Sequence, residues 1–194
     1  MNSTNTIKLK YRQMMHRLWH NKDGVAYVEF ALSLPFLLVL FIGSVEVTRF
    51  IIVSQKVEKS AVTISDVVSQ AENITTTQLN QLITAVEQVM QPYSFDSNGF
   101  VVISSVSKTG TNAPRINWQY TGGGTWTQPS QIGTTGLTAT LPNGLTLNDR
   151  DTVIIAEVYY NYTTLIPSEL ISNRQLYRVA VFKPRLGNLQ ALGS

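Results

Sequence analysis

An apolar run of membrane length near the N-terminus constrains this chain more than any other feature. Val25 to Val47 covers 23 residues, or about 34 Å of α-helix, and a hydrocarbon core is roughly 30 Å thick. A helix that is apolar on all sides needs lipid or a protein interior around it. The run therefore predicts one transmembrane helix.

A carboxylate stands near the start of this run. Glu29 follows Gly24 by five residues, and an ionised group in a membrane helix costs roughly 2.5 to 3.5 kcal/mol at the bilayer centre, less near the edge. Two interpretations are open. Glu29 could reach the headgroups and complement the positive end of the helix dipole, or it could have a specific partner.

The pattern around Glu29 resembles a known signal. A basic leader, a glycine, a carboxylate five residues later and an apolar helix are similar to the class III signal of type IV prepilins. The finer resemblance is to the TadE-like minor pilins of Flp/Tad pili, whose signature is approximately Gly-x-x-x-Val-Glu-Phe-Ala-x-x-x-Pro. The matching residues are Gly24, Val28, Glu29, Phe30, Ala31 and Pro35. A weaker similarity to the closing strands of that family lies at residues 158–162 and 182–185.

This resemblance implies a processing and assembly site at Gly24, Val25, Glu29 and Phe30. A prepilin peptidase would cut between Gly24 and Val25, and Glu29 would then meet the new N-terminal amine of a neighbouring subunit. The implied partners are membrane lipid, the prepilin peptidase, other pilins and the pilus assembly platform. The major Flp pilin is little more than the helix. A chain of this length is therefore expected to be a minor pilin that supports pilus assembly and surface attachment.

The charge distribution indicates an orientation in the membrane. Residues 1–24 carry five basic groups and one acidic group, a net charge of +4, whereas the remaining residues carry −1. The positive-inside rule places this leader in the cytoplasm and the C-terminal part outside. The resemblance implies that the membrane is a bacterial inner membrane. The high pI belongs to the leader, so nucleic acid is not an expected partner. A cleaved secretory signal is the rival, but its apolar region would be shorter.

The helical pattern continues beyond the membrane. One apolar stripe recurs at steps of three or four residues and predicts a helix to about residue 71. Its members are Phe50, Val53, Val57, Ala61, Ile64, Val68 and Ala71. The stripe could pack on the chain's own domain, or part of it could pack against neighbouring subunits.

The remaining residues predict a sheet domain. A second amphipathic helix begins near Thr75, Thr76 or Thr77 and ends at Gln91-Pro92. Strands are expected at 100–106, 115–120, 137–141, 153–163 and 176–183, separated by turns at 97–99, 122–124 and 142–144. Ile154, Ala156, Val158, Tyr160 and Tyr162 share one face of a strand, and Glu157 points the other way. We expect helices to cover one face of an antiparallel sheet, with a long hairpin or mobile loop within 107–136.

The predicted fold class is therefore α+β, with a long N-terminal transmembrane and stalk helix ahead of an exported antiparallel sheet domain. The predicted division is 1–24 basic cytoplasmic leader, 25–47 transmembrane helix, 48–72 helical stalk and 73–194 exported α+β domain. With no cysteine in the chain, this domain must rely on its core without disulfides.

Residues that could carry chemistry are few. His16 and His20 lie four apart in the leader without a further metal ligand, and Asp149-Arg150-Asp151 is explained by a turn better than by calcium binding. Trp118, Tyr120 and Trp126 could form a contact patch or pack a hairpin. We predict no catalytic, cofactor-binding or metal-binding residues and no enzyme. The alternative function is a membrane-tethered exported binding module outside any pilus, and a periplasmic hydrolase is a distant third.

Overall fold

The computed structural model describes Met15, residues 23–165 and residues 174–193. It divides into two compact units, Met1–Val47 and Thr48–Ser194. The basic residues of the leader and both histidines lie outside the described residues. Helix α2 (Asp23–Ser69) forms the described part of the first unit and continues into the second.

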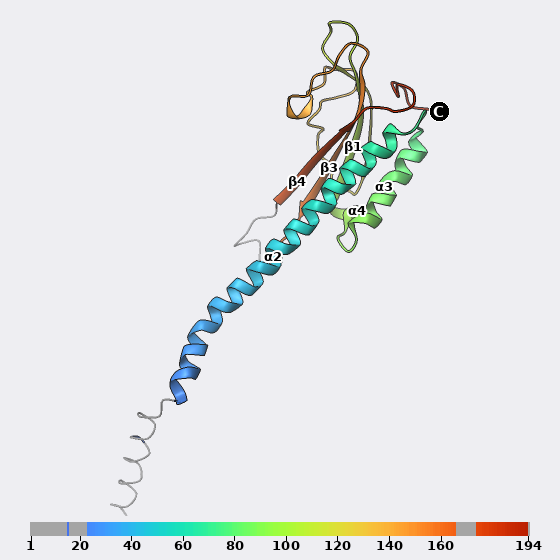
Figure 1. The fold of residues 1–194 in the computed structure, drawn as a ribbon. Helices are drawn as coiled ribbons and strands as arrows, with labels where there is room; N and C mark the ends of the chain where they lie inside the picture. The colour runs from blue at the N-terminus through green and yellow to red at the C-terminus, as the bar shows by residue number, and fades with distance from the viewer. Residues whose placement is uncertain (1–14, 16–22, 166–173, 194) are drawn as a thin grey trace, which may run out of the picture. The chain divides into compact units, whose positions relative to one another are not determined.

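A four-stranded antiparallel sheet forms the centre of the second unit (Figure 1). Its strands are β1 (Gly99–Ser107), β2 (Arg115–Gly123), β3 (Thr152–Tyr162) and β4 (Arg174–Phe182), in the order β2-β1-β3-β4. The central strands β1 and β3 pair along their length and are buried on both faces except at Asn161. The predicted α+β class is confirmed.

Helices α2 and α3 (Thr76–Met90) cover one face of this sheet. Five successive members of the apolar stripe on α2 are buried. Four residues of α3 and every second residue of β3 belong to the same core. The buried stripe residues are Val53, Val57, Ala61, Ile64 and Val68. Packing of the stripe on the chain's own domain, one of the two interpretations left open, is therefore confirmed.

A capping box fixes the start of α3. The Thr75 hydroxyl accepts a hydrogen bond from the Gln78 amide at 3.3 Å, and the Gln78 side chain accepts one from the Thr75 amide at 2.9 Å. Two of the helix's unpaired amides are satisfied in this way. The predicted start near Thr75 and the predicted end at Gln91-Pro92 are both confirmed.

The second face of the sheet is covered by residues 124–151, which we call the strap. The strap has little regular structure apart from a 3-10 turn, η1 (Pro142–Gly144). It nevertheless buries Ile132, Ala139 and Leu147 against Val153 and Ile155. Of the two alternatives expected within 107–136, a long hairpin or a mobile loop, the hairpin is confirmed as far as Gly123 by the pairing of β1 with β2. Beyond Gly123, widely spaced aliphatic side chains pack the strap on the sheet.

The strand expected at 137–141 does not form. The segment makes one isolated bridge, Arg115↔Thr138, and Ile116 N donates to the Leu137 carbonyl at 3.1 Å. Pro142 follows directly and cannot donate to a ladder. The apolar alternation here reflects a few side chains that dock on the sheet, not a paired strand.

The turn expected at 122–124 lies further on, because β2 continues to Gly123, which pairs with Phe100. The glycines are needed for close approach. A Cβ at Gly122 would meet Ile83 Cδ1 at 2.5 Å, and one at Gly124 would meet the Asp96 carbonyl oxygen at 1.9 Å. Glycine lets the end of β2 pass under α3 and α4 (Phe95–Asn98).

The C-terminal segment is hydrogen-bonded to the C-terminal end of α2 and to the residues just before α3. Arg185 N donates to the carbonyl of Ser69, the last residue of α2, at 2.7 Å. Gly193 N donates to the Ile74 carbonyl at 2.8 Å, just before α3 begins. Leu189 is buried, and its carbonyl accepts a hydrogen bond from the Trp118 indole at 2.8 Å. These contacts fasten the chain's last residues to the core.

Candidate functional site

The four predicted site residues occupy the first two turns of α2. Gly24, Val25, Glu29 and Phe30 are all helical and all exposed. Val25 and Glu29 are four residues apart, so they share one face about 6 Å apart along the axis. Phe30 lies on a different face. The structure thus brings Val25 and Glu29 together and leaves Phe30 pointing elsewhere.

Gly24 is not required by packing within the described chain. A Cβ at this position would meet nothing within 4 Å. Its backbone is helical, so no unusual angle calls for glycine either. Neither packing nor backbone conformation in the described residues therefore explains the glycine at this position.

Between Gly24 and Val47, in the first unit, the only charged side chains of α2 are Glu29 and Glu46. No residue of its most apolar 18-residue stretch is buried, and this is the one helix among the described residues with the length and composition to cross a membrane. Its hydroxyls are satisfied internally: Ser33 Oγ donates to the Phe30 carbonyl at 3.0 Å and Ser44 Oγ to the Phe41 carbonyl at 2.8 Å. The helix also continues through Pro35. Such a helix suits lipid, where every polar group needs an internal partner.

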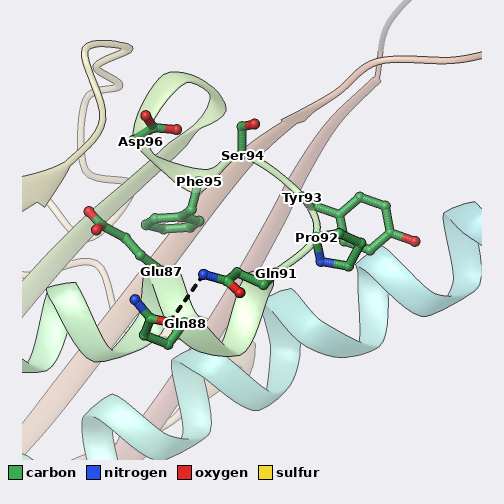
Figure 2. A pocket seen from close by; sticks show the side chains of 8 residues that line it. All are labelled: Glu87, Gln88, Gln91, Pro92, Tyr93, Ser94, Phe95 and Asp96. Carbon is green, nitrogen blue, oxygen red and sulfur yellow. Dashed lines mark hydrogen bonds between the residues drawn. The ribbon is translucent and has the colours of Figure 1, made fainter.

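A shallow pocket of about 290 Å³ lies where α3 turns into α4 (Figure 2). Its lining is mostly polar and consists of Glu87, Gln88, Gln91, Pro92, Tyr93, Ser94, Phe95 and Asp96. The Phe95 ring stacks on Tyr160 with 6.4 Å between ring centres, and Gln91 Nε2 donates to Gln88 Oε1 at 3.1 Å. Phe95 is thus packed into the core, and the Gln91 amide is paired within the lining.

The acidic turn before β3 is occupied by internal contacts. Asp149 accepts a hydrogen bond from Gly110 N, and Arg150 has a positive φ of 62°. Asp151 accepts from Lys183 Nζ at 2.9 Å and from Asn148 N at 3.0 Å. These contacts, the lysine hydrogen bond first, hold the pKa of Asp151 below its ordinary value. The turn interpretation is confirmed, and within the described ranges no three potential ligands gather around a metal position.

The three aromatic residues near the glycines do not form one patch. Trp118 is buried in the core beneath the helices, and Tyr120 packs against the same core. Trp126 instead packs on the opposite face, against Phe100 and Tyr159. Packing, one of the two interpretations left open, accounts for all three.

A buried carboxylate that sequence reasoning placed on the open face is the least expected polar group in the fold. Glu157 is fully buried. It accepts hydrogen bonds from Ser130 Oγ, from Gln131 N at 2.8 Å, from Tyr159 OH at 2.9 Å and from Tyr177 OH at 3.1 Å. Two of these donors belong to the strap and two to the sheet. Glu157 therefore ties the strap to the sheet.

The two tyrosines of this cluster are chemically perturbed. Burial raises the pKa of both Tyr159 and Tyr177 well above its ordinary value, and the neighbouring Glu157 charge raises it further. Both hydroxyls therefore stay protonated and donate. The clue available in the sequence was a single acidic residue between apolar neighbours on both sides, Ala156 and Val158. Its donors in the strap could not be identified without the fold.

These features define a class: a small α+β domain carried by a single helix fit to anchor it in a membrane. Residues 24–63 match the family model of TadE-like proteins. The chain is therefore TadE-like over this segment, which includes the four predicted site residues and the first half of the buried stripe, and the resemblance drawn from the sequence is confirmed there. The TadE-like family is associated with Flp/Tad pili and is generally non-enzymatic. No curated protein and no solved structure matches the chain.

Proposed function

We propose that this chain is a minor pilin or pseudopilin of a Flp/Tad-type pilus, supports pilus assembly and surface attachment, and is no enzyme. The observation that carries the proposal is the TadE-like match, which begins at Gly24 and includes Glu29 and the apolar helix. In this proposal the leader stays in the cytoplasm, α2 crosses the bacterial inner membrane, and the sheet domain is exported.

A prepilin peptidase would remove residues 1–24 and leave Val25 at the N-terminus. The small, exposed Gly24 offers no side chain to obstruct a protease at the peptide bond. Intact-mass analysis of protein extracted from peptidase-positive and peptidase-deficient cells tests this step. We expect a chain starting at Val25 only where the peptidase is present; a chain starting at Met1 in both strains would contradict processing.

Glu29 would then pair with the Val25 amine of an adjacent pilin. Its exposure on an otherwise apolar surface supports such a role, because apolar surroundings strengthen a charge pair. Glu29→Gln should leave membrane insertion intact and abolish incorporation into pili, since the partner's amine would remain buried and unpaired at a cost of about 3 to 5 kcal/mol.

The measurement is the yield of surface pili and of crosslinks between pilins, with Glu58→Gln as the matched control. Glu58 lies on the same helix, and its side chain is 66% exposed with a weak ion pair to Arg178 at 3.9 Å. Normal piliation and crosslinking by the Glu29 variant would refute the pairing.

The second candidate is a membrane-tethered exported module that never enters a pilus. The length of the domain supports this second candidate, because the family match covers residues 24–63 and includes no strand of the sheet. Crosslinking to other pilins separates the two candidates. A tethered module would insert with the same orientation, be digested by protease added to spheroplasts, and give no crosslinks to pilins.

A further inference from the structure

Phe50 joins two segments that are far apart in the sequence. Its ring meets Tyr162 at the end of β3 edge to face, with 5.4 Å between ring centres. The Arg174 guanidinium at the start of β4 lies 6.0 Å from the centre of the same ring. The end of β3 and the start of β4 therefore lie beside α2 at the level of Phe50 (Figure 1).

Exposed aliphatic side chains lie close in the sequence to the residues of this contact. Ile51 and Ile52 follow Phe50 and are 48% and 40% exposed, and Leu165, three residues after Tyr162, is 59% exposed. Arg174 is exposed as well. We call Phe50, Ile51, Ile52, Leu165 and Arg174 the collar. It combines aliphatic groups, an aromatic ring and a guanidinium, which is the composition of protein surfaces at the level of lipid headgroups.

Chain continuity sets the depth of the collar. Phe50 and Ile52 follow Val47, the last residue of the predicted span, by three and five residues, or about 4.5 and 7.5 Å of helix. The headgroup layer on each side of a bilayer is about 5 to 8 Å thick. These positions fall in that layer however the second unit is tilted. Arg174 lies over the Phe50 ring, and Leu165 follows Tyr162, which also contacts Phe50, by three residues.

We propose that the collar docks the sheet domain on the bilayer surface, with Leu165 inserted among the headgroups and Arg174 on the phosphate of an anionic phospholipid. This inference rests on the membrane anchor of the proposed function and goes beyond it. It gives the chain a second membrane contact more than a hundred residues from the first, at the end of β3 and the start of β4. A guanidinium already held over Phe50 is well placed for a phosphate, because its planar donors match phosphate oxygens.

The test uses the full chain, whose lack of cysteine allows single labels. Leu165→Cys carries a fluorophore, and Leu137→Cys is the matched control, because these leucines are 59% and 62% exposed. A third label at Val39→Cys reports insertion of α2. Each protein is reconstituted into nanodiscs of phosphatidylcholine with or without phosphatidylglycerol, and quenching by headgroup-labelled and chain-labelled lipids is measured.

We expect headgroup quenching at 165 to exceed that at 137 several-fold in anionic nanodiscs. It should fall toward the control level with Arg174→Gln or without phosphatidylglycerol. Arg150→Gln, which removes an arginine whose side chain is 90% exposed in the strap, should not change it.

Equal quenching at 165 and 137, with strong quenching at 39, would refute docking of the collar on the bilayer but not the insertion of α2. Loss of quenching at 39 would overturn both. A label at 165 that is shielded from water but not quenched by lipid would mean that protein covers the collar, which also refutes the proposal. Quenching unaffected by Arg174→Gln would refute the phosphate contact.

Discussion

Replacing Glu157 should separate the strap from the sheet. Its carboxylate is the shared acceptor for Ser130, Gln131, Tyr159 and Tyr177, and it is fully buried. Glu157→Ala removes that acceptor. Tyr159 can still donate to the Pro129 carbonyl at 3.0 Å, and Gln131 N keeps its contact with Tyr159 OH at 3.2 Å. The hydroxyls of Ser130 and Tyr177 lose their acceptor.

The expected cost follows from these two orphaned donors. A hydrogen bond to a charged group contributes about 1.5 to 3 kcal/mol, so the loss of two by Glu157→Ala should lower the free energy of unfolding by about 3 to 6 kcal/mol. Glu157→Gln keeps the shape and the acceptor oxygen for Gln131 N and the two tyrosine hydroxyls, whereas the Ser130 hydroxyl loses its acceptor. We expect this variant to lose about 1.5 to 3 kcal/mol, less than Glu157→Ala, because one donor is orphaned and not two.

Denaturant unfolding of the detergent-solubilised chain, followed by the fluorescence of Trp118 and Trp126, measures the loss. Limited proteolysis under native conditions reports the strap directly, and cleavage should concentrate within residues 124–151. Glu58→Ala is the control, because its exposed pair with Arg178 should contribute less than about 1 kcal/mol. Glu157→Ala could destabilise the domain no more than Glu58→Ala does, or it could expose other segments to protease before the strap. Either result would contradict the conclusion that Glu157 holds the strap on the sheet.

Three further outcomes are expected. Thr75→Ala removes a helix cap and should lower the free energy of unfolding by about 1 kcal/mol in the same denaturant assay, whereas Thr75→Ser should restore most of it. Gly124→Ala should destabilise far more than an exposed substitution, because the new methyl would stand 1.9 Å from the Asp96 carbonyl oxygen; a melting temperature like that of the parent would contradict this packing. Because the pKa values of Tyr159 and Tyr177 are raised on folding, only the unfolded chain ionises them as the pH passes about 10, so stability should fall from there upward; absorbance at 295 nm should show these two hydroxyls ionising together with unfolding.

Local rules predicted the helices well. The cap, the apolar stripe and the terminating Gln91-Pro92 of α3 all act within a few residues of one another, so the sequence contains the whole cause. The stripe on α2 was equally clear, yet whether it faces its own sheet or a neighbour depends on contacts with strands far along the chain. Ser65, whose hydroxyl donates to the Ile154 carbonyl at 3.0 Å, illustrates such a contact.

The strap shows why the rest could not be predicted. Its glycines, serines and threonines suggest a loop, and its few aliphatic residues have no periodicity. What orders it is a set of distant partners: Glu157 for Ser130, and Gln119, which donates to the Gly133 carbonyl at 3.1 Å. Glu157 was expected to face solvent because the sequence did not show that the strap covers it. For the site at Gly24 and Glu29, the sequence provides a resemblance and the fold provides neighbouring positions on a helix.

Helix α2 has an exposed apolar N-terminal half and a C-terminal half that packs on the sheet, and this division has a mechanical consequence. A pull along the apolar half reaches the domain through the helix backbone, where the buried stripe from Val53 to Val68 bears it as shear across the sheet face. Arg185 adds a lateral tie, with its guanidinium 2.6 Å from Asp66 on that helix. Several rows of side chains must slip together before the domain yields, so extraction of the helix from a membrane could proceed while the sheet stays folded.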